Sequence, residues 1–295
     1  MSSAVIPSRA RSAALPLAAA ALAAAAFIGM DSTAKLLGER YDTPQVTFLR
    51  FLMGAVYAVP LWLWKRTPLP AGRQWRWHAL RSALLLVALL TWFEALQRLP
   101  LVQAVGVGYT APLFIALLAM WLLRERPSRW IWAAMGIGAV GVAIGLWPEL
   151  SATHAPGSQD RLIGMAAAGL SAVTYAGVVV VARHQAQHDA LWTILLVQNL
   201  LPVVVLAVPM WWLWQPMVAG DVPILLLMGA LATVGLLCIT WAFSHIEASR
   251  AAPVEYTGLV WAALLGFLVF GEVPTLWSLG SAGLIMLGCL LLVKR

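Results

Sequence analysis

Charged residues are scarce in this chain: Asp, Glu, Lys and Arg together make up 11% of its 295 residues. Ordinary globular proteins carry about 25% charged and about 45–50% apolar residues, whereas 62% of this chain is hydrophobic. A soluble fold of this length cannot hide so much apolar surface from water. The composition therefore excludes a soluble enzyme or binding domain and indicates a protein embedded in a membrane.

Cysteine is almost absent, and the few metal-ligating residues are badly placed for a metal. Cys238 and Cys289 both lie in apolar runs, with neither metal-ligand spacing nor the pattern of a disulfide framework. The five histidines lie in loops or at the ends of apolar runs, so neither a metal nor another cofactor is expected. The net charge of +7 does not indicate nucleic-acid binding, because the basic residues lie in short loops and form no face of a soluble domain.

Ten apolar runs, each about long enough to cross a bilayer as a helix, fill most of the chain. They are 13–37, 44–64, 77–98, 100–123, 128–147, 161–183, 190–214, 222–245, 248–271 and 274–293. The longest polar stretch, 148–160, is predicted to be a periplasmic linker between units at 13–147 and 161–293, after a tail at 1–12. The pattern predicts an all-α integral membrane protein of ten transmembrane helices.

The basic residues predict how the chain is oriented. Of the nineteen Lys and Arg residues, fourteen fall on the side of the N-terminus and four on the other, while Arg50 lies inside a span. Because Lys and Arg are concentrated in cytoplasmic loops, both termini are predicted to lie in the cytoplasm, with the protein in a bacterial-type inner membrane. The first apolar run is longer than a signal peptide's core and includes Asp31 and Lys35, so it is expected to be retained.

An internal repeat relates the two halves of the chain at an offset of 147 residues. Tyr109-Thr110 corresponds to Tyr256-Thr257, and Glu125 corresponds to Glu272, each of these glutamates standing two residues before a proline. The two glutamates are predicted to cap or gate helix ends. Each half contains five predicted spans, an odd number, so the halves must have opposite orientations. Inverted repeats are typical of secondary transporters, which bind substrate near the midplane between the halves.

These motifs resemble those of the drug/metabolite transporter superfamily, in particular its EamA-type members. The segments that carry the resemblance are Arg50-Phe51, Tyr109-Thr110-Ala111-Pro112, Glu125-Arg126-Pro127, Ala248-Ser249-Arg250, Glu255-Tyr256-Thr257 and Phe270-Gly271-Glu272-Val273-Pro274. The resemblance implies ten helices in two inverted five-helix repeats and transport without ATP hydrolysis, and the sequence contains no G-x-x-x-x-G-K-[ST] phosphate loop. It selects no substrate, because such proteins include exporters of amino acids and metabolites as well as uptake carriers for cofactor-like molecules.

Four ionisable residues inside the predicted spans are functional candidates, because a charge is costly within a membrane. Asp31, Arg50 and Glu94 are predicted at a similar depth in the outer half, where they could form one cluster in a polar cavity. The alternative is a fixed ion pair of Arg50 with one of the two carboxylates, which would only hold helices together. Glu255 is the deepest carboxylate; it either receives a substrate ammonium group or a proton, or is protonated and bonded to a neighbouring helix.

Two tyrosines, Tyr109 and Tyr256, are predicted near the midplane, which they approach from opposite faces. A phenol offers an apolar ring and a hydrogen-bonding tip, which suits a small organic solute. Pro112 and Pro253 flank the tyrosines and are predicted to act as hinges. Further candidate substrate-binding residues inside spans are Trp92, Gln103, Tyr175, Gln198, Asn199 and Trp241.

The sequence thus predicts a carrier that exports a small polar or zwitterionic metabolite, such as an amino acid or a derivative, by alternating access. Arg50 would meet a carboxylate, and Glu255 or Asp31 would meet an ammonium group or a coupling proton. A second reading is uptake or exchange of a larger cofactor-like solute of nucleoside or vitamin type. A membrane-embedded enzyme is a distant third, because no convergent nucleophile, base or metal ligands are found. The carrier is expected to be a monomer or a homodimer in the lipid bilayer.

Overall fold

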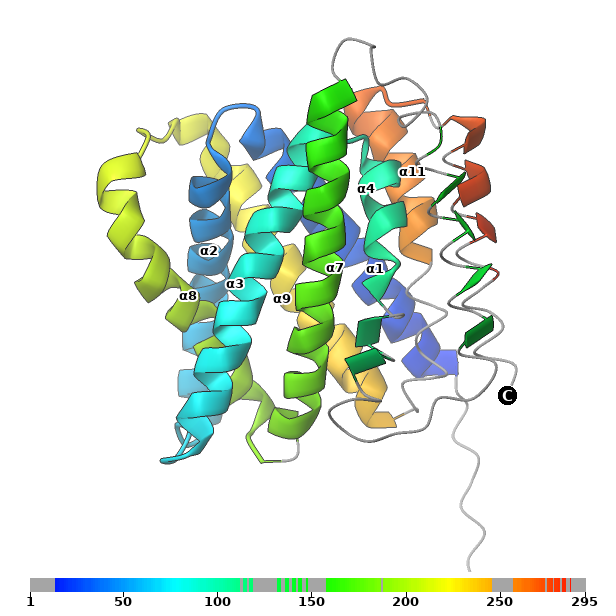
Figure 1. The fold of residues 1–295 in the computed structure, drawn as a ribbon. Coiled ribbons are helices and arrows are strands. Elements are labelled where there is room, and N and C mark those ends of the chain that lie inside the picture. The colour runs from blue at the N-terminus through cyan, green and yellow to red at the C-terminus, as the bar shows by residue number, and fades with distance from the viewer. Residues whose placement is uncertain are drawn as a thin grey trace, which may run out of the picture.

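The computed structural model describes residues 14–111, 114–115, 117–118, 158–186, 188–245 and 257–273, together with scattered positions between 132 and 147 and between 275 and 287. Every regular element in these residues is a helix (Figure 1). The helices that carry the site are α1 Ala14–Gly38, α2 Thr43–Lys65, α3 Gln74–Arg98, α4 Leu101–Gly108, α7 Ser158–Ala186, α8 Leu191–Leu213, the short 3-10 helix η1 Ala219–Asp221, α9 Val222–His245 and α11 Thr257–Phe270.

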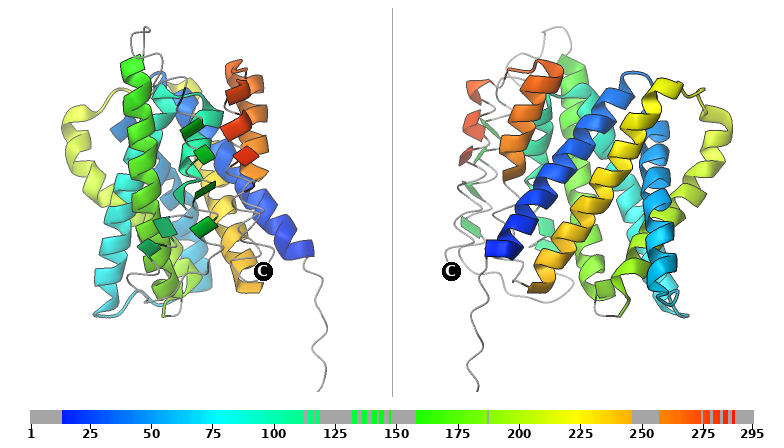
Figure 2. Two further views of the ribbon diagram at one scale, coloured as in Figure 1. Left: turned by 45° about the vertical axis from the view of Figure 1, so that its right-hand side comes forward. Right: turned by 180° about the vertical axis from the view of Figure 1, so that it is seen from behind.

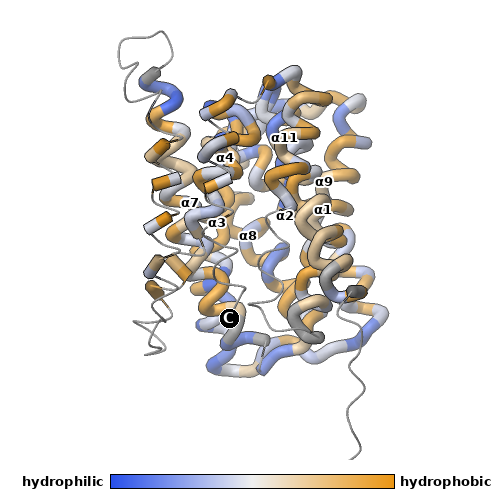
Figure 3. Tube along the Cα trace, turned by 90° about the vertical axis from the view of Figure 1, so that its right-hand side faces the viewer, coloured by the Kyte–Doolittle hydropathy of each residue, from blue (hydrophilic) through white to orange (hydrophobic). Residues whose placement is uncertain are grey.

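Six of these helices, α1, α2, α3, α7, α8 and α9, contain segments long and apolar enough to cross a membrane, and α11 is apolar but shorter. Hydrophobic residues follow the lengths of the helices, and many of the hydrophilic ones gather toward the two ends of the bundle (Figure 3). The predicted all-helical, multi-pass membrane architecture is therefore confirmed. The count of ten spans stays a prediction, because much of 100–147 and of 248–293 lies outside the described residues.

Most helix ends fall within three residues of their predicted positions, and two segments are informative. Helix α7 begins at Ser158, so the last three residues of the predicted linker 148–160 are helical. Asp160 lies in the first turn of α7, where a negative charge interacts favourably with the helix dipole. Polar residues can therefore extend a transmembrane helix beyond its apolar run, and hydropathy alone places the start too late.

Helix α4 ends after eight residues, within the span predicted over 100–123, in which Pro112 is the predicted hinge. Tyr109 and Thr110 form a turn, in which the Thr110 N–H bonds to a carbonyl only three residues back at 3.0 Å. Pro112 has no N–H for the carbonyl of Gly108, so the helical hydrogen-bond ladder lacks a rung at this point. The helix is therefore interrupted at the predicted midplane tyrosine, three residues before the predicted hinge Pro112, which itself lies outside the described residues.

The helices of the two halves interlock instead of forming separate bundles. Helix α1 packs along α9, and α3 packs along α7 (Figures 1 and 2). Helix α2 contacts α8 and α9, α3 contacts α8, α1 contacts α11, and α4 contacts both α7 and α11. At the offset of 147 residues, α1, α2 and α3 correspond to α7, α8 and α9. The contact of α1 with α9 therefore matches that of α3 with α7, the contact of α2 with α9 matches that of α3 with α8, and the contact of α2 with α8 is related to itself.

Two apolar cores border the polar residues discussed below. The larger core lies between α1, α2, α3, α4 and α9 and contains Leu49 and Phe93. A smaller core of Phe51, Leu85, Val178 and Leu206 lies between α2, α3, α7 and α8. Arg50 stands in the chain between Leu49 of one core and Phe51 of the other, so its charge is held at the junction of the two.

Candidate functional site

Asp31 of α1 is buried, with 5% of its surface exposed. The indole N–H of Trp92 on α3 donates a hydrogen bond to Asp31 Oδ1 at 3.0 Å. Each residue lies about 10 Å along its helix from the end drawn uppermost in Figure 1, at a rise of about 1.5 Å per residue. Among the described residues, the indole is the single hydrogen-bond donor to this carboxylate. A buried carboxylate needs more compensation than one neutral donor supplies, so Asp31 can still bind a cationic group.

Arg50 of α2 is also buried, with 7% exposed. Its Nη1 donates a hydrogen bond to Oδ1 of Asn199 on α8 at 3.1 Å, and its guanidinium carbon lies 4.7 Å from the ring centre of Phe51. Its Nε is buried and has no hydrogen-bond partner in the described part of the chain. The guanidinium therefore keeps a free donor and a full charge, and it can bind an anionic group.

The charges of Asp31 and Arg50 are close enough to interact electrostatically. Within the described residues, however, no ion pair of 4.0 Å or less joins Arg50 to Asp31 or to Glu94. The fixed ion pair considered as an alternative is thus not formed. Two opposite charges that interact without pairing directly could each bind one end of a solute with an ammonium and a carboxylate group.

Two glycines leave room for the side chains of Trp92 and Tyr109, which lie near each other. Gly108, the last residue of α4, lies against the Trp92 ring, and a Cβ at this position would be 2.9 Å from the nearest ring carbon. The Tyr109 hydroxyl lies over Gly258 at the start of α11, so closely that a Cβ there would overlap the phenol oxygen. Both aromatic side chains occupy room that only glycine leaves. Asp31, Arg50, Trp92, Tyr109 and Asn199 are called the central polar cluster below.

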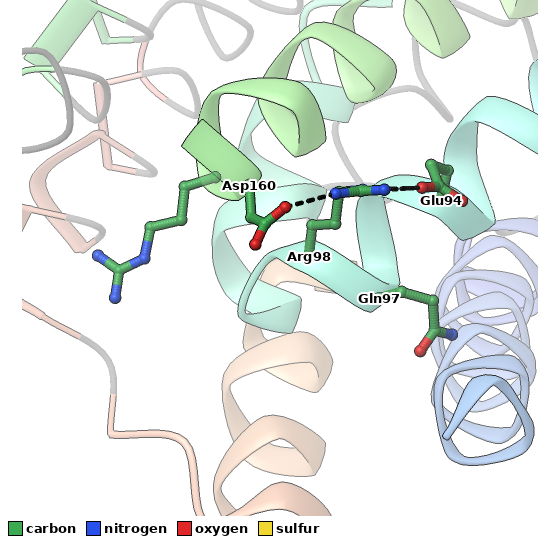
Figure 4. A pocket seen from close by; sticks show the side chains of 5 residues that line it. Glu94, Gln97, Arg98 and Asp160 are labelled. Carbon is green, nitrogen blue, oxygen red and sulfur yellow. Dashed lines mark hydrogen bonds and ion pairs between the residues drawn. The ribbon is translucent and has the colours of Figure 1, made fainter. Parts of the chain in front are cut away.

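Glu94 does not join this cluster. Its carboxylate pairs with Arg98 one turn further along α3 at 2.6 Å, and it accepts a hydrogen bond from the Thr43 hydroxyl at 2.7 Å. Arg98 also pairs with Asp160 at 2.7 Å, and Figure 4 shows Arg98 between the two acids. With Gln97, these residues line an open pocket of about 500 Å³ at the upper end of the bundle. Glu94 is thus satisfied by its i,i+4 partner and by Thr43 of α2, and not by Arg50.

The other predicted site residues are distributed as follows. Gln103 on α4 and Gln198, the neighbour of Asn199, each have a buried side-chain oxygen with no partner among the described residues. Tyr175 and Trp241 are 45% and 38% exposed, so they lie at the surface of the described bundle. Glu255 and Tyr256, like the predicted hinges Pro112 and Pro253, lie outside the described residues.

Sequence reasoning missed an ionic contact at the upper end. Lys35 Nζ pairs with Glu272 Oε1 at 2.5 Å and also donates to the Leu99 carbonyl at 2.7 Å. Glu272 Oε2 accepts the N–H of Leu101, the first residue of α4, at 2.7 Å. This group, called the upper clasp below, joins α1, the start of α4 and the segment after α11. A capping role was predicted for Glu272, but the helix that it caps is contributed by the other half of the chain.

A second set of contacts ties the halves together at the lower end. Arg81 on α3 is 9% exposed and donates to Gln185 Oε1 on α7 at 3.0 Å. One turn away, His78 lies 3.1 Å from Asp189. Arg81 is one of the fourteen basic residues counted on the side of the N-terminus to predict orientation, but the structure buries it between helices. Hydropathy gave no signal of this, because the residue lies near the end of its apolar run.

Several membrane-spanning helices from two interlocked halves surround buried polar groups whose hydrogen-bonding capacity is only partly used. Such an arrangement is typical of membrane transport proteins. The chain belongs to the EamA-like transporter family, whose model matches residues 13–147 and again 162–294. The resemblance noted in the motifs is therefore confirmed.

Curated relatives are transporters of different solutes. The chain is 25% identical to an S-adenosylmethionine uptake transporter of Rickettsia bellii, over 89% of this chain and 88% of the relative. It is 27% identical to the pseudopaline exporter CntI of Pseudomonas aeruginosa (93% and 94% covered) and 28% identical to a riboflavin transporter of Vibrio cholerae (88% and 87% covered). A crystal structure that is 21% identical superimposes with a TM-score of 0.63, covering 95% of this chain and 96% of that one; this likeness concerns the fold.

Proposed function

We propose that this protein is a secondary transporter of the inner membrane that exports a small polar or zwitterionic metabolite, an amino acid or amino-acid derivative, by alternating access. One observation carries the proposal: Arg50 is buried at the junction of the two halves, and within the described part of the chain its hydrogen-bond partner is neutral and its Nε donor is unused. A solute carboxylate would bind Arg50, while its ammonium group, or a coupling proton, would be taken by Asp31. Glu255 is the second candidate for the latter role, and Tyr109 and Tyr256 would frame the solute.

Alternating access is supported by the reciprocal helix packing and by the family model, which matches each half of the chain separately. Both suit ten helices in two inverted five-helix repeats, at 13–147 and 161–293. In the proposed orientation both termini are cytoplasmic, so the upper end in Figure 1 faces the periplasm. The helix break at Tyr109 supports a midplane site, since interrupted helices supply the binding groups in many transporters of this architecture.

The relatives favour two directions of transport. The pseudopaline exporter supports export, and S-adenosylmethionine is itself an amino-acid derivative with one carboxylate and one ammonium group, the chemistry proposed for Arg50 and Asp31. The Rickettsia and Vibrio relatives favour the second candidate, uptake or exchange of a larger cofactor-like solute. That solute would depend more on Trp92 and Tyr109 than on the charges.

Counterflow in proteoliposomes tests the proposal. Vesicles are loaded with a mixture of amino acids, S-adenosylmethionine, nucleosides and vitamins, and the solutes exchanged are identified by mass spectrometry. Arg50→Gln is expected to lower the exchange of carboxylate-bearing solutes at least about tenfold, because a charge-assisted hydrogen bond is lost. Arg98→Gln, the same change in the upper pocket, is the matched control and should retain exchange. Undiminished exchange by Arg50→Gln would overturn the proposal.

A further inference from the structure

The partner of Arg50 is an amide where a carboxylate would have nearly the same shape. Asn199 and Asp differ in one terminal group, so a full ion pair was available at this position at no steric cost. The second buried arginine between the halves, Arg81, is likewise bound by a neutral amide, that of Gln185. Both buried arginines therefore cross between the halves without a carboxylate partner among the described residues.

Asn199 is oriented by its own helix. Its Nδ2 donates to the Leu195 carbonyl at 2.8 Å, so its Oδ1 is the atom left to face Arg50. The amide occupies room left by Gly54, the middle residue of α2, since a Cβ at Gly54 would overlap the Asn199 oxygen. At the positions related by the repeat offset, Asn199 corresponds to Leu52 and Gly54 to Leu201. The arrangement therefore exists on one side of the repeat only, as a specific feature and not as part of a symmetric scaffold.

We infer that Asn199 is a positioning residue: it holds the Arg50 guanidinium at the junction of the halves without neutralising it, and so reserves its charge for the carboxylate of the transported solute. The inference rests on the proposed function. A carboxylate at position 199 would form a strong ion pair with Arg50 in this low-dielectric setting. The solute's carboxylate would then have to displace an internal one. A neutral acceptor fixes the geometry and leaves the electrostatic attraction to the solute.

The test compares Asn199→Asp with Asn199→Ala in the purified full-length protein. Both variants lose the bond to Leu195, so they are matched for that change. Counterflow is measured with a mixture of amino acids and the corresponding amino-acid amides, which differ only in the carboxylate. We expect Asn199→Asp to lower amino-acid exchange at least about tenfold, and to bring the ratio of amino-acid to amide exchange close to one. Asn199→Ala removes the contact that positions Arg50 but adds no competing charge, so it should lose less amino-acid exchange than Asn199→Asp and keep the ratio of amino-acid to amide exchange above one.

A purely structural role predicts the reverse order, because aspartate can pair with Arg50 and alanine cannot. Melting temperatures in detergent separate folding from transport: Asn199→Asp should melt no lower than Asn199→Ala while transporting less. Equal or better transport by Asn199→Asp would overturn the inference and leave the proposed function standing. If the native protein exchanges no carboxylate-bearing solute, the proposed function fails, and the inference fails with it.

Discussion

Substitution of Glu272 in the upper clasp tests most directly whether the contacts at the upper end control access to the site. Glu272 joins parts of both halves, since one carboxylate oxygen pairs with Lys35 and the other accepts the Leu101 N–H. If transport proceeds by alternating access, the upper end can open only when these contacts break. Glu272→Gln removes the charge and presents an amide donor, which cannot satisfy both partners. We therefore expect the variant to open at the upper end more often than the native protein.

The magnitude follows from the burial of the pair. The side chains of Lys35 and Glu272 are 14% and 18% exposed, between a surface ion pair and a fully buried one. Exposed pairs contribute about 0.2–1 kcal/mol, and breaking a buried pair costs about 3–5 kcal/mol. A cost of about 2 kcal/mol for the clasp corresponds to a roughly 30-fold larger open population.

Cysteine labelling measures that population. Ala104 is fully buried about one turn along α4 from Leu101, and Ala104→Cys would be placed in a background from which Cys238 and Cys289 are removed. A membrane-impermeant maleimide added on the periplasmic side then labels Cys at position 104 only when the upper end opens. At a maleimide concentration low enough that labelling is slow relative to opening and closing, the labelling rate follows the open population and should rise about 30-fold with Glu272→Gln.

Glu39→Gln is the control for the lost negative charge. Glu39 lies at the same end, is exposed, and makes no ion pair with any described residue. Its replacement should change the labelling rate less than about twofold, as expected for a surface charge. If Glu272→Gln labels no faster than Glu39→Gln, the clasp does not control access, and the reasoning is refuted.

Two further predictions concern the cluster and the helix packing. Trp92→Phe keeps a ring against α4 but removes the donor to Asp31, so counterflow should fall several-fold with little change in Tm; unchanged counterflow would separate this hydrogen bond from transport. Gly229→Ala would place a Cβ 2.9 Å from the Met53 backbone and should lower stability by about 1–3 kcal/mol in denaturant unfolding. Gly169→Ala, with nothing within 4 Å, should be neutral or stabilising by up to about 1 kcal/mol, and equal effects of the two changes would contradict the packing described.

The architecture was accessible from the sequence because it depends on local properties. A run of apolar residues predicts a spanning helix wherever it occurs, so α2, α8 and α9 end within a residue of their predicted positions. A hinge was predicted at Pro112, but the end of the helix at Gly108 was harder to foresee, because proline within a membrane helix often bends it without interrupting it. Here Pro112 removes a hydrogen-bond donor just where the chain turns, and hydropathy does not record that loss.

Most partners of the charged residues could not be predicted from the sequence. Spacing correctly offers Arg98 to Glu94, since residues four apart share a helix face. The same rule offers Lys35 to Asp31, yet Lys35 reaches Glu272, which lies 237 residues away in the chain. Depth along the helices placed Asp31 and Arg50 together, but it could not reveal that Asn199 is the partner of Arg50.

What the sequence by itself determined is that this is a helical membrane protein with an internal repeat and a few costly charges inside its spans. These properties follow from hydropathy and spacing, which act within one helix or recur at a fixed offset. Only the tertiary structure decided which charges are satisfied and which are left with unused capacity. Hydrogen bonds and ion pairs depend on side-chain direction over a few ångströms between helices distant in the chain, and the interlocking of the two halves sets those directions.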